Sequence, residues 1–187
     1  MIRGPKHISR SGYKLETALD VFNVDPKDYI CVDISATRGG ITNCLLDKKA
    51  KKVYSIDVGA SQYFESTHKN KKDVQEKTDL RSLVLPEKAD IVMLDISHIS
   101  LTHILKDISN LAKENGTIIT IIKPQYEVEK KHILKDGIVD SEFREDAIKK
   151  VCDYAKTLGL QNKGVTESPI TSVEGNTEFF AWFEKKN

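Results

Sequence analysis

Apolar residues follow two different spacings along the chain, and the two spacings alternate. In four stretches they recur every three or four positions, which predicts helices with one buried face: residues 12–22, 41–49, 98–116 and 141–159. In five shorter stretches they are nearly continuous, which predicts strands buried on both sides: residues 29–35, 53–57, 90–97, 117–123 and 177–183. The alternation predicts an α/β fold, with a mostly parallel sheet covered by helices on both faces.

Glycines mark where two of the predicted helices end. Gly116 and Gly159 follow the last apolar residues of the third and fourth helices and are expected to cap them. Residues 124–140 show neither spacing, and a loop of that length in a compact domain is usually functional or mobile. Because no repeat or shift in composition divides the chain, we expect a single domain over residues 1–187, with a basic arm at 1–10.

The composition is that of a folded, soluble protein, with 187 residues, 39% of them hydrophobic and 30% charged. No apolar run approaches the roughly 18 residues that cross a membrane. The N-terminus also lacks the apolar segment of a secretory signal, so a cytoplasmic location is expected. Cys31, Cys44 and Cys152 form no CxxC pair and are expected to be small hydrophobic residues in a reducing compartment. No metal site is predicted.

Charge is unevenly distributed, although the net charge is only +1. Residues 1–15 contain no acid, and four bases lie among them: Arg3, Lys6, Arg10 and Lys14. Further basic clusters occur at residues 48–52 and 68–72. Clusters of this kind can contact phosphates. For the two later clusters, a solvated lysine-rich face is an equally good interpretation.

Chemically active side chains follow the predicted strands. Asp33, Asp57, Asp95 and Lys123 each stand at a strand end, and in open α/β sheets ligands bind outside the carboxyl ends of the strands. After Asp33 comes a turn with two glycines, 39 and 40, which allows the backbone to approach a ligand. The spacing is not GxGxxG. A tight strand-to-helix connection is the alternative explanation of this turn.

Two of these strand-end residues indicate specific roles. Asp57 lies 24 residues after Asp33, where an acid can accept both hydroxyls of a ribose; otherwise it is a solvated strand-end acid. Lys123 ends a strongly apolar strand, and a buried lysine can serve as a general base. Its alternatives are a lysine that extends to solvent or a structural pair with Asp95.

Seven segments occur in a characteristic order between Ser9 and Phe183: SRSGYKLETAL, VDISATRGG, VYSIDVG, MLDISHIS, IIKPQYE, KDGIVD and SPITSVEGNTEF. Together they resemble the TlyA haemolysin family of FtsJ-type RNA ribose 2′-O-methyltransferases. The resemblance implies a Rossmann-like methyltransferase fold with a mostly parallel, seven-stranded sheet. It also implies S-adenosylmethionine (SAM) as cofactor and ribosomal RNA or a ribosomal subunit as substrate.

The resemblance further implies a catalytic set of four residues: Lys14, Asp95, Lys123 and Glu178. In this family pattern Lys123 is the general base that takes the proton of a ribose hydroxyl. Its neutral form would be favoured by burial and by the nearby Lys14. Asp95 would orient Lys123, and Glu178 would hold Lys14.

The implied cofactor residues lie along the same strand ends. Asp33 would lie near the methionine end of SAM, Asp57 would bind the ribose, and Asp79 would lie near the adenine. The full set adds neighbours of these residues and the turn: Asp33, Ser35, Ala36, Gly39, Gly40, Asp57, Val58, Asp79, Leu80 and Asp95. The implied RNA contacts are basic: Arg3, Lys6, Arg10 and Arg38.

The sequence departs from the family pattern in four respects. Ser35 stands where the family usually has glycine, Arg38 where it has a small residue, and His98 where it has an aromatic residue. Most relatives also have an N-terminal S4-type RNA-binding domain, which is expected to be absent because this chain starts about ten residues before the SGYKL helix. The alternative function is therefore a non-catalytic RNA- or ribosome-binding module with a degenerate SAM site. Neither DNA nor a membrane is an expected partner, and a nicotinamide dehydrogenase is disfavoured by the missing GxGxxG.

Overall fold

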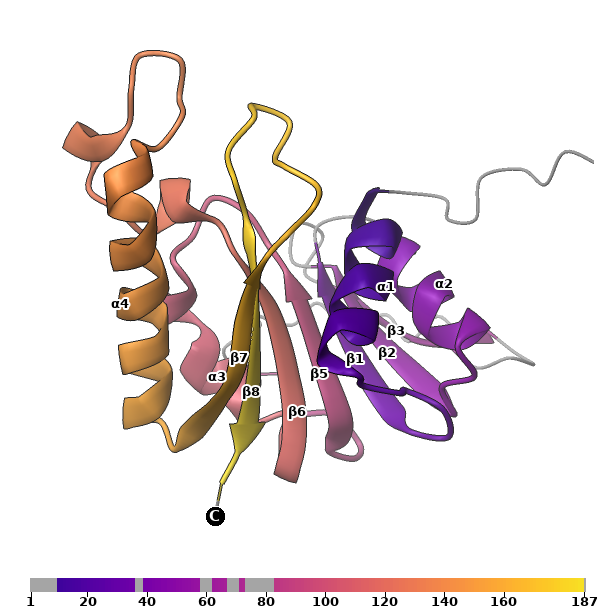
Figure 1. Cartoon of the computed structure of the whole chain (residues 1–187). Helices are drawn as coiled ribbons and strands as arrows, with labels where there is room; N and C mark the ends of the chain where they lie inside the picture. The colour runs from indigo at the N-terminus through magenta and orange to yellow at the C-terminus, as the bar shows by residue number, and fades with distance from the viewer. Residues whose placement is uncertain (1–9, 36–38, 58–61, 67–70, 73–82, 187) are drawn as a thin grey trace, which may run out of the picture.

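The computed structural model describes residues 10–35, 39–57, 62–66, 71–72 and 83–186. Eight strands in these ranges form one sheet, in the order β4-β3-β2-β1-β5-β6-β8-β7. Its centre is parallel and consists of β1 (Ile30–Ser35), β2 (Lys52–Asp57), β5 (Ala89–Asp95) and β6 (Ala112–Ile122). Figure 1 shows these strands side by side through the middle of the molecule.

Antiparallel strands complete both edges of the sheet. At one edge β3 (Gln62–Ser66) pairs with β2, and the short β4 (Lys71–Lys72) pairs with β3. At the other edge β8 (Phe179–Lys185) runs against β6, and β7 (Leu160–Glu167) runs against β8. The described sheet therefore has eight strands rather than the seven expected, while its parallel centre agrees with the prediction.

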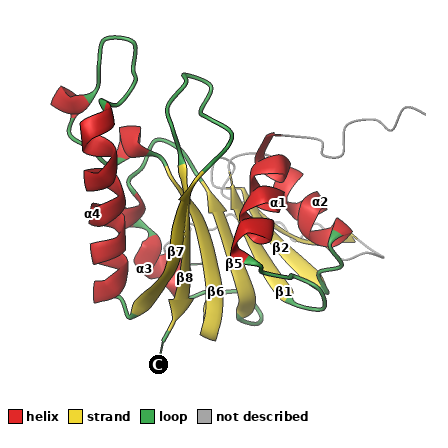
Figure 2. Cartoon of the chain, in the orientation of Figure 1, coloured by secondary structure: helices red, strands yellow, loops and turns green. Residues whose placement is uncertain are grey.

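Among the described residues, two α-helices lie on each face of the sheet (Figures 1 and 2). The helices α1 (Arg10–Phe22) and α2 (Gly40–Asp47) share one core with strand residues such as Cys31 and Met93. The helices α3 (Leu105–Ser109) and α4 (Arg144–Thr157) pack on the other face, in a core with strand residues such as Val32. Neighbouring residues 31 and 32 point to opposite faces because side chains alternate along a strand. The prediction of helices on both faces is confirmed.

Three of the four predicted helices are confirmed, as α1, α2 and α4. Gly159 follows α4 with a left-handed φ of 74°, as its expected capping role requires. The helix predicted over residues 98–116 is confirmed only for α3, because Leu101–His103 is a 3₁₀ turn and the helix ends at Ser109. Strand β6 starts three residues later, at Ala112.

The early start of β6 involves a bulge. The pairing with β5 jumps from Ala89↔Ala112 to Ile91↔Thr117, so the intervening residues of β6 have no partner on β5. Gly116 is not a helix cap here. A Cβ atom added to it would lie 2.8 Å from the carbonyl oxygen of Lys113, so this glycine permits a close backbone approach.

The pattern missed β7, because most of its residues are polar and partly or fully exposed, and it also missed the edge strands β3 and β4. Residues 124–140 contain only short 3₁₀ turns, at Pro124–Tyr126 and Lys130–His132, and one bridge between Ile133 and Val139. This agrees with the loop expected there. Among the helices described, none is both long and apolar enough to cross a membrane.

Candidate active site

The strand register brings the predicted strand-end residues together at the carboxyl ends of the parallel strands. Ser35, the last residue of β1, pairs with Asp57 of β2 on one side and with Asp95 of β5 on the other. Lys123 directly follows β6, the next strand along. The predicted carboxyl edge is therefore assembled from four adjacent parallel strands.

Asp95 and Lys123 also share one face of the sheet, the face covered by α1 and α2. Met93, Ile121 and Phe180 all pack in the core beneath these helices. Three site residues lie two positions from these, and side chains two positions apart along extended backbone project to the same side: Asp95 on β5, Lys123 just after β6 and Glu178 just before β8. Lys14 comes to this face from α1, in which it is buried.

Lys123 is held by two partners, one at the end of β5 and one just after it. Its Nζ atom lies 2.7 Å from Oδ1 of Asp95 and donates a hydrogen bond of 2.9 Å to Oγ of Ser97. The side chains of Lys123 and Asp95 are 10% and 9% exposed. The contact that sequence reasoning left as a possible pair is therefore formed, and Ser97 is an additional partner.

Lys14 and Glu178 form a second buried ion pair. Nζ of Lys14 donates to Oε2 of Glu178, across 164 residues of sequence. Glu178 is 2% exposed. Buried ion pairs recover their desolvation cost only with good geometry, and they contribute little to net stability. Two such pairs on one face, beside the strand ends, hold four charged side chains in fixed positions.

Asp33 is a fully buried carboxyl group between β1 and α2. Oγ1 of Thr42 donates to its Oδ2 at 2.6 Å, whereas Oδ1 is buried with no hydrogen-bond partner among the described residues. Burial raises the pKa of Asp33 to about 6, although the Thr42 hydrogen bond opposes the shift. A buried acceptor without a donor costs free energy until a ligand supplies one.

Helix α2 starts directly after a glycine with an unusual backbone conformation. Gly39 precedes this helix with a left-handed φ of 91° and provides no side-chain cap. A side chain at this φ would be strained, and uncapped N–H groups attract anionic atoms. Asp33 and this helix start therefore fit the ammonium and carboxylate groups of a methionine moiety.

Several predicted cofactor residues lie outside this description. For Asp57 the structure describes the backbone at the end of β2 but not the side chain. Four more predicted residues lie outside the described ranges: Ala36, Val58, Asp79 and Leu80. Their roles remain predictions from the family resemblance.

Of the predicted RNA contacts, only Arg10 is described. Its Nη2 atom donates to the carbonyl oxygen of Thr171 at 2.7 Å, which ties α1 to the connection between β7 and β8. Part of its guanidinium group is therefore used inside the molecule. The other three predicted contacts, Arg3, Lys6 and Arg38, lie outside the described residues.

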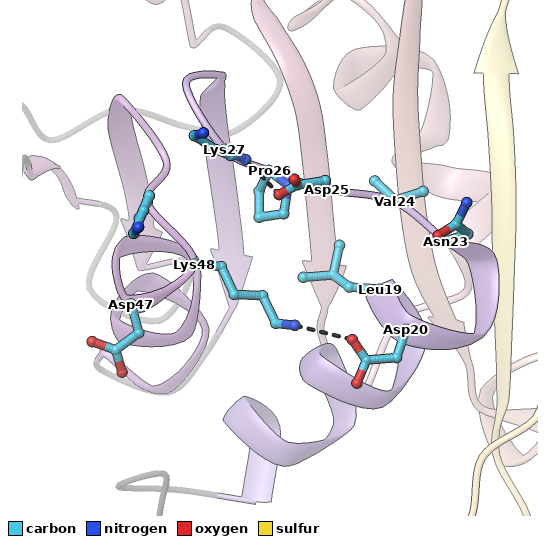
Figure 3. Close-up of a pocket in the computed structure, with 10 residues that line it drawn as sticks. Leu19, Asp20, Asn23, Val24, Asp25, Pro26, Lys27, Asp47 and Lys48 are labelled. Carbon is cyan, nitrogen blue, oxygen red and sulfur yellow. Dashed lines mark hydrogen bonds and ion pairs between the residues drawn. The ribbon is translucent and has the colours of Figure 1, made fainter.

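An open hollow lies near the amino ends of β1 and β2, at the opposite ends of the strands from this site. Figure 3 shows it between the ends of α1 and α2, where Lys48 forms an ion pair with Asp20 at 3.0 Å. Its volume is about 460 Å³, and none of the four proposed catalytic residues lines it. Lys52, in the same basic cluster, pairs with Glu87 at 3.0 Å. The cluster at residues 48–52 is thus remote from the strand ends and partly neutralised.

Sequence reasoning missed three polar residues around Lys123. Besides Ser97, these are Glu127, which is 5% exposed, and Tyr126, whose ring lies 5.4 Å from that of His98. His98 itself has a left-handed φ of 69°, which is uncommon for a residue other than glycine. The signal in the sequence was Glu127 in the segment KPQYE. An acid in a predicted loop is normally expected to be exposed to solvent.

Comparison with known proteins identifies the family. The family model described as "FtsJ-like methyltransferase" matches residues 7–185. The chain belongs to the FtsJ-like methyltransferase family. Solved structures of FtsJ-like relatives share the fold closely. Candidate hemolysins from Streptococcus thermophilus and Lactococcus lactis, each 31% identical, have TM-scores of 0.84 and 0.86. These cover 100% and 98% of this chain, and 70% and 90% of theirs.

Curated relatives of this FtsJ-like chain match it over nearly its whole length. YqxC of Bacillus subtilis is 36% identical over 93% of this chain. A protein of Mycobacterium tuberculosis named 16S/23S rRNA (cytidine-2′-O)-methyltransferase TlyA is 35% identical over 94%. A protein of Campylobacter jejuni named 23S rRNA (cytidine-2′-O)-methyltransferase TlyA is 37% identical over 96%. The chain spans 64%, 67% and 71% of the length of these three proteins.

Proposed function

We propose that this chain is a SAM-dependent methyltransferase that modifies the ribose 2′-oxygen of ribosomal RNA. The observation that carries the proposal is the pair of buried lysine–carboxylate contacts, Lys123–Asp95 and Lys14–Glu178, on one face of the sheet. They lie on the same face as the buried carboxyl group of Asp33. The relatives named as rRNA 2′-O-methyltransferases support the choice of substrate.

Lys123 is the proposed general base. A ribose hydroxyl is a weak acid, so its oxygen becomes a good nucleophile only as its proton leaves. The Nζ atom of Lys123, in its neutral form, accepts that proton. Asp95 and Ser97 fix the direction of this Nζ atom, which limits the positions from which it can reach a hydroxyl.

Lys14 and Glu178 are proposed to position the substrate ribose. Lys14 projects from α1 to the same face as Lys123, and Glu178 holds its ammonium group in place. A fixed cation beside the reacting oxygen stabilises the negative charge that develops there. In this assignment Lys14 provides electrostatic stabilisation and Lys123 removes the proton.

The cofactor is proposed to occupy the carboxyl edge between β1, β2 and α2. When bound, SAM supplies a methyl group activated by its positively charged sulfur. Asp33 would accept from the methionine ammonium, and the start of α2 at Gly39 and Gly40 would face the carboxylate. Asp57 would accept the ribose hydroxyls. Ser35, Ala36, Val58, Asp79 and Leu80 complete the proposed pocket.

The proposed partner is ribosomal RNA, free or within a ribosomal subunit, and the proposed location is the cytoplasm, where that substrate is found. Arg3, Lys6, Arg10 and Arg38 are proposed to contact its phosphates. For Arg10 this concerns the donors that the bond to Thr171 leaves available.

Transfer of a labelled methyl group to ribosomal RNA tests the proposal. Replacing Lys123 with alanine removes the base, and we expect the transfer rate to fall by roughly 10²–10⁴-fold. SAM binding, measured by calorimetry, is expected to stay within about twofold of wild type, because Lys123 is proposed to act on the ribose. Lys149→Ala, at a lysine whose side chain is 74% exposed on α4, serves as a matched control.

Two outcomes would contradict this function. Equal labelling by wild type and Lys123→Ala would exclude Lys123 as the base. Absence of SAM binding at millimolar cofactor would instead favour a non-catalytic RNA- or ribosome-binding module, with Ser35 in place of the usual glycine as the first residue to examine. Ser35→Gly then distinguishes a pocket narrowed by this side chain from one that is lost.

A further inference from the structure

Glu127 is a buried carboxylate outside the proposed catalytic set. Its side chain is 1% exposed, and both oxygens are hydrogen-bonded to the segment that follows β5. Oε2 accepts from Oγ of Ser100 at 2.5 Å, and Oε1 accepts from the backbone N–H of Leu101 at 2.7 Å. A carboxylate is rarely buried without such partners, so this arrangement specifies the relative position of two segments.

A lysine from α4 completes the environment of Glu127. Nζ of Lys150 lies 3.3 Å from Oε2 of Glu127 and donates to the backbone carbonyl oxygen of the same residue at 2.7 Å. The lysine side chain is 44% exposed, so one side of the pair reaches solvent while the carboxylate does not. Glu127 is therefore fixed from two directions, by the segment after β5 and by α4.

The contacts of Glu127 and Lys123 join the same two segments. Lys123 bonds to Ser97, and four residues later Glu127 bonds to Ser100. Between these connections the rings of Tyr126 and His98 are in contact. Three successive links thus hold the segment after β5 against the segment after β6, with Lys123 at the end nearest the sheet.

The local turn does not need the carboxylate of Glu127 as a cap. The 3₁₀ turn at Leu101–His103 already has an N-cap, because Oγ of Ser100 accepts from the backbone N–H of Thr102. Glu127 adds a second acceptor that comes from the segment carrying Lys123. Its effect is to fix the distance between the Lys123 segment and the Ser97 segment, which the turn alone does not define.

We propose that Glu127 is a positioning residue for Lys123: it holds the segment from Ser97 to Leu101 so that Asp95 and Ser97 direct the Nζ atom. The proposal rests on the proposed function for its catalytic consequence. Its structural part, that Glu127 orders this segment, stands independently of any activity.

The first test measures methyl transfer to ribosomal RNA in a single turnover. Glu127→Ala is expected to lower the rate constant by about 10–100-fold, while the dissociation constant for SAM stays within about twofold. Glu127→Gln is expected to recover most of the rate, because an amide can still accept from the Leu101 N–H. Glu129→Ala, two residues away at a side chain that is 72% exposed, is expected to behave like wild type.

A double-mutant cycle separates positioning from simple loss of stability. If Glu127 acts through Ser97, Ser97→Ala should cost little further rate in the Glu127→Ala background. If the loss of rate in the double variant equals the product of the losses in the two single variants, the proposal is overturned. If Glu127→Ala does not fold, Ser100→Ala, which removes the donor to Oε2 of Glu127, replaces it in the cycle with Ser97→Ala.

Hydrogen exchange distinguishes failure of this inference from failure of the proposed function. The Leu101 amide, which donates to Glu127, is expected to exchange at least tenfold faster in Glu127→Ala and to be unchanged in Glu129→Ala. Unchanged exchange would overturn the inference whatever the activity. Faster exchange in a protein with no methyl transfer would retain the ordering role of Glu127 and reject the methyltransferase function instead.

Discussion

At the scale of single residues, Asp33 links the proposed cofactor site to the stability of the protein. Its carboxyl group is fully buried, and Oγ1 of Thr42 donates a hydrogen bond to it. Burial raises its pKa from 3.8 to about 6, so the folded state holds a proton that the unfolded state releases. The favourable contribution of the protonated form is present below the unfolded pKa and is lost as the pH rises through about 6.

Replacing Asp33 with asparagine should therefore stabilise the ligand-free protein at neutral and higher pH. A pKa difference of this size corresponds to about 2–3 kcal/mol, and the amide oxygen can still accept from Thr42. We expect the gain in the free energy of unfolding to be largest at pH 7–8 and to shrink as the pH falls below 6. Urea titrations at several pH values measure it.

Asp25→Asn is the matched control, since this acid is exposed and bonds within its own turn. It should change stability by less than about 0.5 kcal/mol at each pH. A gain for Asp33→Asn that does not vary with pH would show that Asp33 is ionised equally in both states. The same substitution should weaken SAM binding, because it removes the charge proposed to face the methionine ammonium.

Residue-level prediction from the sequence succeeded where a side chain followed a clear strand. Asp95 and Lys123 were found because each ends an apolar run, and the structure joins them at 2.7 Å. Lys14 and Glu178 were found only through the family resemblance, since no local pattern connects residues 164 positions apart. Glu127 was missed because its burial depends on how two loops pack against each other and against α4. Such packing leaves no periodic pattern in the sequence.

At the scale of elements, the crossover from β5 to β6 shows tertiary pairing overriding local preference. The stretch from Leu111 to Asn115 contains good helix formers, and the sequence predicted a helix through it. Pairing with β5 draws Ala112 into the sheet instead, and the surplus residues form the bulge before Thr117. Sequence periodicity cannot anticipate this, because the competing partner is a strand distant in sequence.

The bulge makes Gly116 the most constrained glycine of this crossover. A methyl group added there would lie 2.8 Å from the carbonyl oxygen of Lys113 and 3.3 Å from that of Ala89. Both are backbone atoms that cannot rotate away, so we expect Gly116→Ala to destabilise the protein by about 1–3 kcal/mol. The midpoint of urea unfolding measures this change.

Asn110→Ala is a suitable control for that substitution. Asn110 is exposed in the same crossover with helical backbone angles, so alanine should change stability by less than about 0.5 kcal/mol. If Gly116→Ala were as stable as wild type, the bulge would have to adapt by shifting the pairing between β5 and β6. A loss much above 3 kcal/mol would indicate that the whole crossover is disrupted.

At the scale of the molecule, the carboxyl ends and the amino ends of the parallel strands carry different groups. They form the carboxyl edge and the amino edge of the sheet. The carboxyl edge gathers Asp33, Asp95 and Lys123 near the start of α2, where the N-cap residue is Gly39. The amino edge carries the hollow of Figure 3, in which Lys48 pairs with Asp20 at 3.0 Å. The alternating pattern of the sequence was sufficient to predict this polarity, because parallel strands all end on the same side. It could not predict a hollow made by loops.

SAM binding should therefore protect one edge of the molecule and leave the other unchanged. We expect slower hydrogen exchange at the end of β1 and in the first turn of α2, because the proposed ligand covers their amides. Residues 23–27 and 47–49, which line the hollow, should exchange as in the free protein. Binding to the folded state alone also raises the melting temperature, by an amount that increases with the logarithm of the SAM concentration.

Asp57→Ala decides whether that protection comes from the proposed site. Asp57 ends β2 next to Ser35, and its carboxylate is proposed to hold the ribose. Loss of this carboxylate should reduce the melting-temperature shift at a given SAM concentration and weaken protection at β1 and α2 together. Protection at residues 47–49 that persists in Asp57→Ala would place the cofactor in the hollow at the amino edge. In that case the ion pairs at the carboxyl edge would need another explanation, because Lys123 would lie at the opposite end of the strands from the methyl donor.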